Sequence, residues 1–158
     1  MIEPLENIQR CDDMNKIILA ATCEDVRREE GGKISLMGVF DTLQVVDFAR
    51  SLPAFHVFAQ LGFESKGSHS VVIAIRSEDG EYGIELQRRV EATVELEAEG
   101  LFVAEFDWKL DSLKLPKPGR YRLYFVTDLA QELVGPCFMA KASPPVAVTT
   151  SRSRAISS

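Results

Sequence analysis

Apolar and polar side chains alternate with a period of two through most of the chain. In residues 102–110, Phe102, Phe106 and Trp108 fall on one side, while charged residues fill most of the other. An extended strand sorts alternate positions to opposite faces, whereas a helix scatters them around its circumference. About eight segments are therefore expected to be strands: 17–23, 33–40, 55–63, 71–75, 88–99, 102–110, 120–127 and 133–139.

Turn residues separate most of these segments. Gly31 and Gly32 follow an acidic pair, and Asp79-Gly80 suits the positive φ angles of a tight hairpin. Pro136 removes a ladder donor and places the last strand at an edge or a bulge. Clean alternation also argues against a parallel sheet, whose strands read as continuous apolar runs. The pattern predicts an all-β fold, a two-sheet antiparallel sandwich of the jelly-roll or immunoglobulin-like kind.

Residues 88–99 are the ambiguous segment, because their Glu and Ala content also favours a helix. Val90, Ala92 and Val94 nevertheless occupy alternate positions, so we interpret the segment as a strand. With Gly100 as a turn, it forms a hairpin with residues 102–110. That hairpin would gather an acidic stripe on one face: Glu91, Glu95, Glu97, Glu99, Glu105 and Asp107.

The length of 158 residues fits one domain. We expect a polar leader over residues 1–15, a β-sandwich domain over 16–142 and a disordered tail over 143–158, since the tail is rich in Pro, Ser and Thr. Translation starts at Met1 or at Met14; the sequence leaves both open.

Four segments together resemble a known pattern: GGKISLMGVFDTL, LPAFHVFAQL, GSHSVVIAIRSEDG and PGRYRLYF. In this order they resemble an uncharacterised bacterial family of small β-sandwich proteins, a domain of unknown function. The resemblance covers roughly residues 16–139 and rests on turn and core positions. It implies a sandwich fold and supplies no catalytic or binding residues.

Net charge and cysteine content disfavour several classes of protein. The net charge of −6 disfavours a binder of nucleic acid or of an anionic membrane surface. Cys11, Cys23 and Cys137 are odd in number and widely spaced, so neither a disulfide framework nor a zinc site is expected. With no apolar segment near the N-terminus and none long enough to span a membrane, we expect a cytoplasmic protein.

The sequence holds no recognisable catalytic set, so no enzyme activity and no cofactor are expected. His56 and His69 are the only histidines, and we interpret both as structural. Cys137, on the expected edge strand, is the more accessible thiol, although nothing beside it in sequence indicates activation.

Phe58 and Tyr124 are apolar residues on the polar faces of their strands, which indicates an exposed apolar patch. The acidic stripe, represented by Glu95, Glu97 and Asp107, is either a solubilising face or a docking surface for a basic partner. From these residues we expect a non-catalytic interaction module that binds a protein partner or associates with itself.

A ligand-binding sandwich is the alternative. Carboxylates on loops at one end of a sandwich bind calcium when six to eight oxygens converge. Asp41, Asp79 and Asp111 are the candidate ligands, and a cleft beside Trp108 is the candidate site for a small molecule.

Overall fold

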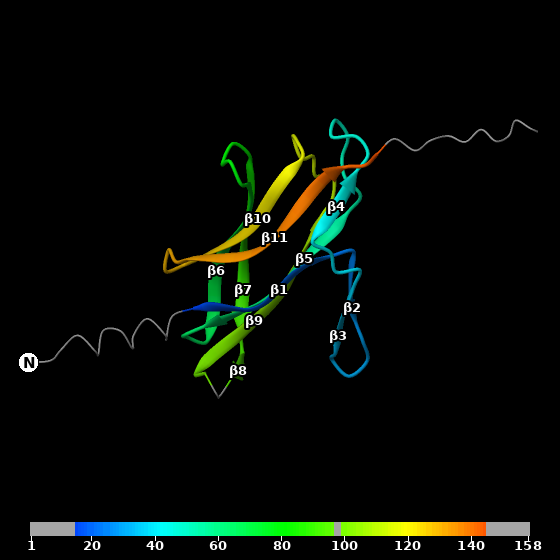
Figure 1. Cartoon of the computed structure of the whole chain (residues 1–158). Helices are drawn as coiled ribbons and strands as arrows, with labels where there is room; N and C mark the ends of the chain where they lie inside the picture. The colour runs from blue at the N-terminus through cyan, green and yellow to red at the C-terminus, as the bar shows by residue number, and fades with distance from the viewer. Residues whose placement is uncertain (1–14, 97–98, 145–158) are drawn as a thin grey trace, which may run out of the picture.

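The structure, a computed structural model, describes residues 15–96 and 99–144. These residues form eleven β-strands and no helix, which confirms the all-β prediction (Figure 1). The strands are β1 (Lys16–Cys23), β2 (Asp25–Arg28), β3 (Ile34–Met37), β4 (Thr42–Val45), β5 (Phe55–Phe63), β6 (Gly67–Ser77), β7 (Gly83–Ala92), β8 (Val94–Leu96), β9 (Leu101–Leu110), β10 (Gly119–Thr127) and β11 (Glu132–Ala142). Nearly all of the predicted leader and tail lies outside the described residues. The described part of the chain contains no helix of the length and apolarity that a membrane crossing requires.

The strands are arranged in three sheets. A five-stranded sheet has the order β4-β11-β10-β6-β7, a four-stranded sheet has the order β1-β5-β9-β8, and β2 pairs with β3. Among the described strands, β11 and β4 form the one parallel pair. The structure thus has more strands and one more sheet than the sequence predicted. β2 and β4 contain four residues each, too few to produce an alternation that the sequence pattern reveals.

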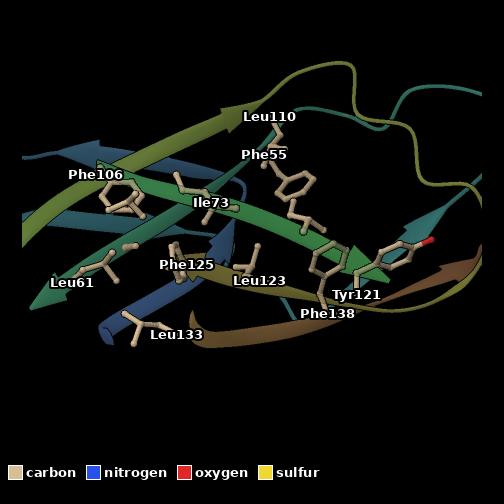
Figure 2. Packing of buried hydrophobic residues seen from close by; sticks show 14 of the residues in the cluster. Phe55, Leu61, Ile73, Phe106, Leu110, Tyr121, Leu123, Phe125, Leu133 and Phe138 are labelled. Atoms are coloured by element: carbon tan, nitrogen blue, oxygen red, sulfur yellow. The ribbon is translucent and has the colours of Figure 1, made fainter. Parts of the chain in front are cut away.

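The hydrophobic core lies between the five-stranded and the four-stranded sheets. Alternate residues of β5 and β9 meet alternate residues of β6, β10 and β11, as the period of two requires. Figure 2 shows the aromatic part of this contact. Phe106 of β9 packs edge-on to Phe125 of β10 with ring centroids 6.1 Å apart, and Phe55 of β5 packs against Phe138 of β11 at 6.0 Å.

The β6–β7 hairpin forms where Asp79-Gly80 predicted it. Gly80 has a φ of 77°, and its N–H donates to the Ser77 carbonyl. The Asp79 carboxylate accepts hydrogen bonds from the Ser77 hydroxyl at 2.7 Å and from the Glu81 N–H at 2.9 Å. The aspartate side chain therefore satisfies turn donors that the strand ladder leaves open.

The predicted strand 88–99 is interrupted at Thr93, where the chain passes from one sheet to the other. Before it, β7 pairs with β6 in the five-stranded sheet; after it, β8 pairs with β9 in the four-stranded sheet. Val94 lies opposite Val103, on the outer side of the sheet, and Glu95 lies opposite Phe102. The alternation of the sequence therefore changes side at Thr93, and Val94 is exposed rather than buried.

Away from this crossing, β7 and β9 lie close together, but their backbones are not paired. The Arg88 side chain of β7 spans the gap, since its Nη1 donates to the Asp107 carbonyl of β9 at 2.6 Å. The same guanidinium lies 5.9 Å from the centroid of the Phe106 ring. A side chain, rather than strand pairing, thus joins the two larger sheets along this seam.

Candidate interaction surface

The outer face of the five-stranded sheet carries an aromatic and aliphatic centre. Strand register places Tyr124 of β10 between Val134 of β11 and Ala74 of β6. Val134 is 59% exposed and Tyr124 is half-buried. The Arg76 guanidinium stacks on the Tyr124 ring, 4.6 Å from its centroid, which fixes the ring in place.

Four cations project from one end of the same face. Arg122 lies opposite Arg76 in β6, and Arg120, two residues earlier in β10, lies opposite Met139 in β11. Lys141 follows Met139 at the next position on that side of β11. We call the whole surface the Tyr124 face and define it by these residues: Val72, Ala74, Arg76, Arg120, Arg122, Tyr124, Val126, Val134, Cys137, Met139 and Lys141.

Two arginines of the Tyr124 face are held by neighbours. Arg122 Nη1 donates to the Gly135 carbonyl at 2.9 Å, and Arg76 Nη1 forms an ion pair with Glu132 Oε1 at 3.2 Å. The alternation along β10 placed Tyr124 on this face, but it did not indicate the cations around it, because their proximity depends on the register between β6, β10 and β11.

Phe58 does not belong to an exposed patch, contrary to the prediction. It is 1% exposed, and contacts of strand β2 with neighbouring residues indicate that this strand covers it on the outer side of the four-stranded sheet. Asp25 of β2 lies 3.8 Å from His56 Nε2, and Arg28 of β2 pairs with Glu105 at 3.2 Å. These two anchors lie on either side of Phe58 along the sheet.

The acidic stripe does not form as a continuous surface. Glu91 belongs to the five-stranded sheet, and the side chain of Glu99 pairs with Lys16. Asp107 accepts a hydrogen bond from His56 Nδ1 at 3.0 Å, so it serves the attachment of β2 rather than an open surface. Glu95 is exposed in the middle of β8, and Glu97 lies outside the described residues.

The predicted calcium ligands do not assemble into a site. In the described residues, no group of three or more His, Cys, Asp or Glu side chains is placed to hold a metal ion. Asp41 and Asp111 are exposed in separate loops. The Asp79 carboxylate binds the Lys117 ammonium, and this hydrogen bond, with those from the turn, holds the pKa of Asp79 well below its usual range.

His69 lies in a polar cluster that sequence reasoning did not identify. Its Nδ1 donates to Asp128 Oδ2 at 2.9 Å, and its Nε2 lies 2.8 Å from the Ser65 carbonyl and 3.4 Å from the Ser65 hydroxyl. The order Ser-His-Asp superficially matches a hydrolase triad. A triad histidine, however, uses Nε2 to accept from the serine hydroxyl, whereas the closer carbonyl here is an acceptor. The cluster therefore ties two turns together.

A groove beside Trp108 opens where β7 and β9 diverge. It has a volume of about 530 Å³, and its walls include Tyr82 and Ile84 from the β7 side and Trp108 from β9. The Tyr82 hydroxyl donates to the Lys114 carbonyl at 3.0 Å, which fixes one wall. The predicted cleft beside Trp108 therefore has a counterpart in the structure.

Two cysteines lie in the described residues, and both are free thiols. Cys23 is fully buried, and this burial raises the pKa of its thiol, which lowers its reactivity. Cys137 is half-buried on the Tyr124 face. Cys11 lies outside the described residues.

Comparison with known proteins gives a matching family model and distant structural likenesses. A model described as a family of unknown function (DUF6941) matches residues 18–132. No curated protein sequence matches the chain. A solved structure of Pseudomonas fluorescens alkylpurine DNA glycosylase AlkC, bound to DNA containing an abasic site analogue, has a TM-score of 0.45 and 10% identity. That match covers 81% of this chain and 30% of the glycosylase chain, and a likeness this weak supports no inference about function.

Proposed function

The chain belongs to the DUF6941 family, and we propose that it is a non-catalytic interaction module that binds a protein, or a second copy of itself, through the Tyr124 face. One observation carries the proposal. An aromatic ring, an exposed aliphatic side chain and several arginines share one face of the five-stranded sheet.

The composition of this face matches that of binding hot spots. Tyrosine and arginine dominate the energy of many protein interfaces, because both combine a large contact area with directional hydrogen bonding. Tyr124 is already held against Arg76, so binding costs little additional side-chain entropy. The same face places Val134 in solvent beside Tyr124, where a partner would cover it.

The proposal includes an architecture and a compartment. The two larger sheets share one core, so we regard them as the halves of a sandwich. The free thiols Cys23 and Cys137 suit the reducing cytoplasm. Recovery of the full-length protein in a secreted or membrane fraction, rather than in the cytoplasmic fraction, would contradict this compartment.

Site-specific photo-crosslinking tests the proposed function. A photoreactive amino acid replaces Val134 in the full chain, and a matched variant carries it at Val94, which is equally exposed on the other sheet. We expect a discrete protein crosslink from position 134 in cells, lost when Tyr124 is also changed to Ala. Mass spectrometry then identifies the partner as another protein or as this chain.

Two results would remove the support for this proposal. One is equal crosslinking from positions 134 and 94, which indicates random collisions. The other is a position-134 crosslink that Tyr124→Ala leaves unchanged, since the ring beside it would then contribute nothing.

The Trp108 groove supports a second candidate function, the binding of a small molecule. Its lining combines apolar side chains such as Trp108 and Ile84 with polar and charged ones such as Asp111 and Lys114, and ligand sites use both kinds of group. Trp108 is the only tryptophan, so its fluorescence reports occupancy of this groove alone. A panel of metabolites that shifts neither the emission nor the melting temperature would exclude the candidates tested.

A further inference from the structure

The cations of the Tyr124 face indicate the chemistry of the partner. Arg76, Arg120, Arg122 and Lys141 project from three neighbouring strands toward the same side. We propose that this end of the face binds an acidic segment of a partner protein, while Tyr124 contacts apolar side chains of the same segment. The inference rests on the proposed function, because it specifies what the Tyr124 face binds.

The charge around this end differs from that of the whole chain, which is −6. On the same face, Glu132 is occupied by Arg76, and Glu85 and Glu91 lie on β7, at the edge of the sheet. A cluster of cations on an otherwise acidic chain attracts an acidic partner to one place, while the remaining surface repels it.

Two of the four cations are held in place by neighbouring groups, and the other two are available to bind a carboxylate. Arg122 is held by the Gly135 carbonyl, and Arg76 is held by the Tyr124 ring and by Glu132, so both lose less entropy when a carboxylate binds. Within the described residues, the side chains of Arg120 and Lys141 make no hydrogen bond or ion pair. The Glu78 N–H donates to the Arg120 carbonyl, so an acidic residue lies beside Arg120 on the β6 side, and we expect the acidic segment to bind on the β11 side.

The size of the cluster favours a protein segment over a nucleic acid. Duplex DNA carries about one negative charge per 1.7 Å of axis, so a strand would extend past four cations onto acidic surface. A short acidic segment places its carboxylates within the cluster and ends there. Arginine also offers paired N–H donors that match the geometry of a carboxylate.

Fluorescence anisotropy with the full chain tests the inference. The probe is a labelled synthetic peptide that alternates Glu with Leu and Tyr; the comparison probes are the same peptide with Lys in place of Glu and a single-stranded oligonucleotide of similar length. We expect the acidic peptide alone to bind, about tenfold more weakly in high salt than in low salt, because screening weakens exposed ion pairs.

Charge reversal at the two available cations gives the sharper comparison. We expect Arg120→Glu with Lys141→Glu to weaken binding of the acidic peptide at least about tenfold. The matched control is Lys33→Glu with Lys66→Glu, which makes the same change of net charge at exposed residues of two turns away from the face. The control should bind almost as tightly as the native chain.

The outcomes separate this inference from the proposed function. The proposal of an acidic partner would be overturned if both double variants lost binding equally, or if binding did not depend on salt. It would also be overturned if the acidic peptide did not bind, or if the basic peptide or the oligonucleotide bound more tightly. If the crosslink at position 134 still depends on Tyr124 in such a case, the interaction face stands and only its partner chemistry is wrong. If that crosslink also fails to depend on Tyr124, both proposals fall.

Discussion

Single polar side chains form hydrogen bonds between turns that the backbone pairing of the strands does not connect. His69 is buried, stacks on Phe63 with ring centroids 4.1 Å apart, and binds both Ser65 and Asp128, the second of which lies 59 residues further along the chain. Its two ring nitrogens contact the Asp128 carboxylate and the Ser65 carbonyl, both of which accept hydrogen bonds. At this scale a residue acts by connecting segments that are distant in sequence.

Replacing His69 by Phe tests this connection. The new ring preserves the stack on Phe63 but removes the polar contacts of both ring nitrogens, so we expect a loss of about 2 kcal/mol in the free energy of unfolding by urea. Ser65→Ala is the control, because it removes the hydroxyl at 3.4 Å and keeps the carbonyl at 2.8 Å. A Ser65→Ala loss as large as that of His69→Phe would show that the hydroxyl is the real partner.

The Asp79 and Lys117 pair makes a prediction about acid. The hydrogen bond from Lys117, followed by those from Glu81 and Ser77, lowers the pKa of Asp79 in the folded chain. A lowered pKa stabilises the folded state above the unfolded value of about 3.9, and this stabilisation is lost as pH falls below it. We therefore expect Asp79→Asn to melt at a lower temperature than the native chain near neutral pH. The difference should shrink below about pH 4; a constant difference at every pH would contradict the ion pair.

Among the elements, the β2–β3 hairpin acts as a cover for the outer side of the four-stranded sheet. Asp25 of the hairpin contacts His56 and Arg28 pairs with Glu105, and these two contacts lie on either side of the buried Phe58. An element with two four-residue strands has little stability alone, so its position depends on what it covers.

Phe58→Ala should therefore loosen the hairpin as well as destabilise the chain. We expect a loss of about 3 kcal/mol in the free energy of unfolding, because a fully buried ring is removed. Amide hydrogen exchange in residues 25–37 should increase more than in the core strands. Tyr124→Ala is the matched aromatic control, with a much smaller loss, since Tyr124 lies on an outer face. Similar losses from both variants would argue against the covered position of Phe58.

The sequence predicted the long strands well and the short ones poorly, for a physical reason. β9 and β10 have about ten residues each, so their alternation is unmistakable. β4 pairs with β11, which lies far away in the chain and which no local pattern indicates, whereas β2 pairs with the nearby β3 but is too short to show an alternation. The alternation around Val90 and Val94 even misled the interpretation, because the chain changes sheet at Thr93 without breaking the pattern. The position of Tyr124 on an outer face could be predicted from the alternation within its own strand. The cations around it could not, because they come together only through the register between β6, β10 and β11.

For the whole molecule, the decisive feature is how the two larger sheets are joined along β7 and β9. Where a closed barrel would have strand pairing, this chain has the Arg88 side chain, which donates to the Asp107 carbonyl and lies over Phe106. The Trp108 groove opens at the end of the same seam. The separation of the sheets, and with it the shape of the groove, should therefore depend on one guanidinium.

Arg88→Ala should open this seam. We expect the free energy of unfolding to fall by about 2 kcal/mol, because a charged donor to a backbone carbonyl is lost. The emission of Trp108 should shift to longer wavelength as water enters beside the neighbouring Asp107. Arg89→Ala is the matched control: it removes the adjacent arginine, which points to the other face and donates to the Ser68 hydroxyl at 3.0 Å. If the two variants gave the same stability and the same emission, Arg88 would not hold the sheets together, and the groove would have to be maintained by core packing alone.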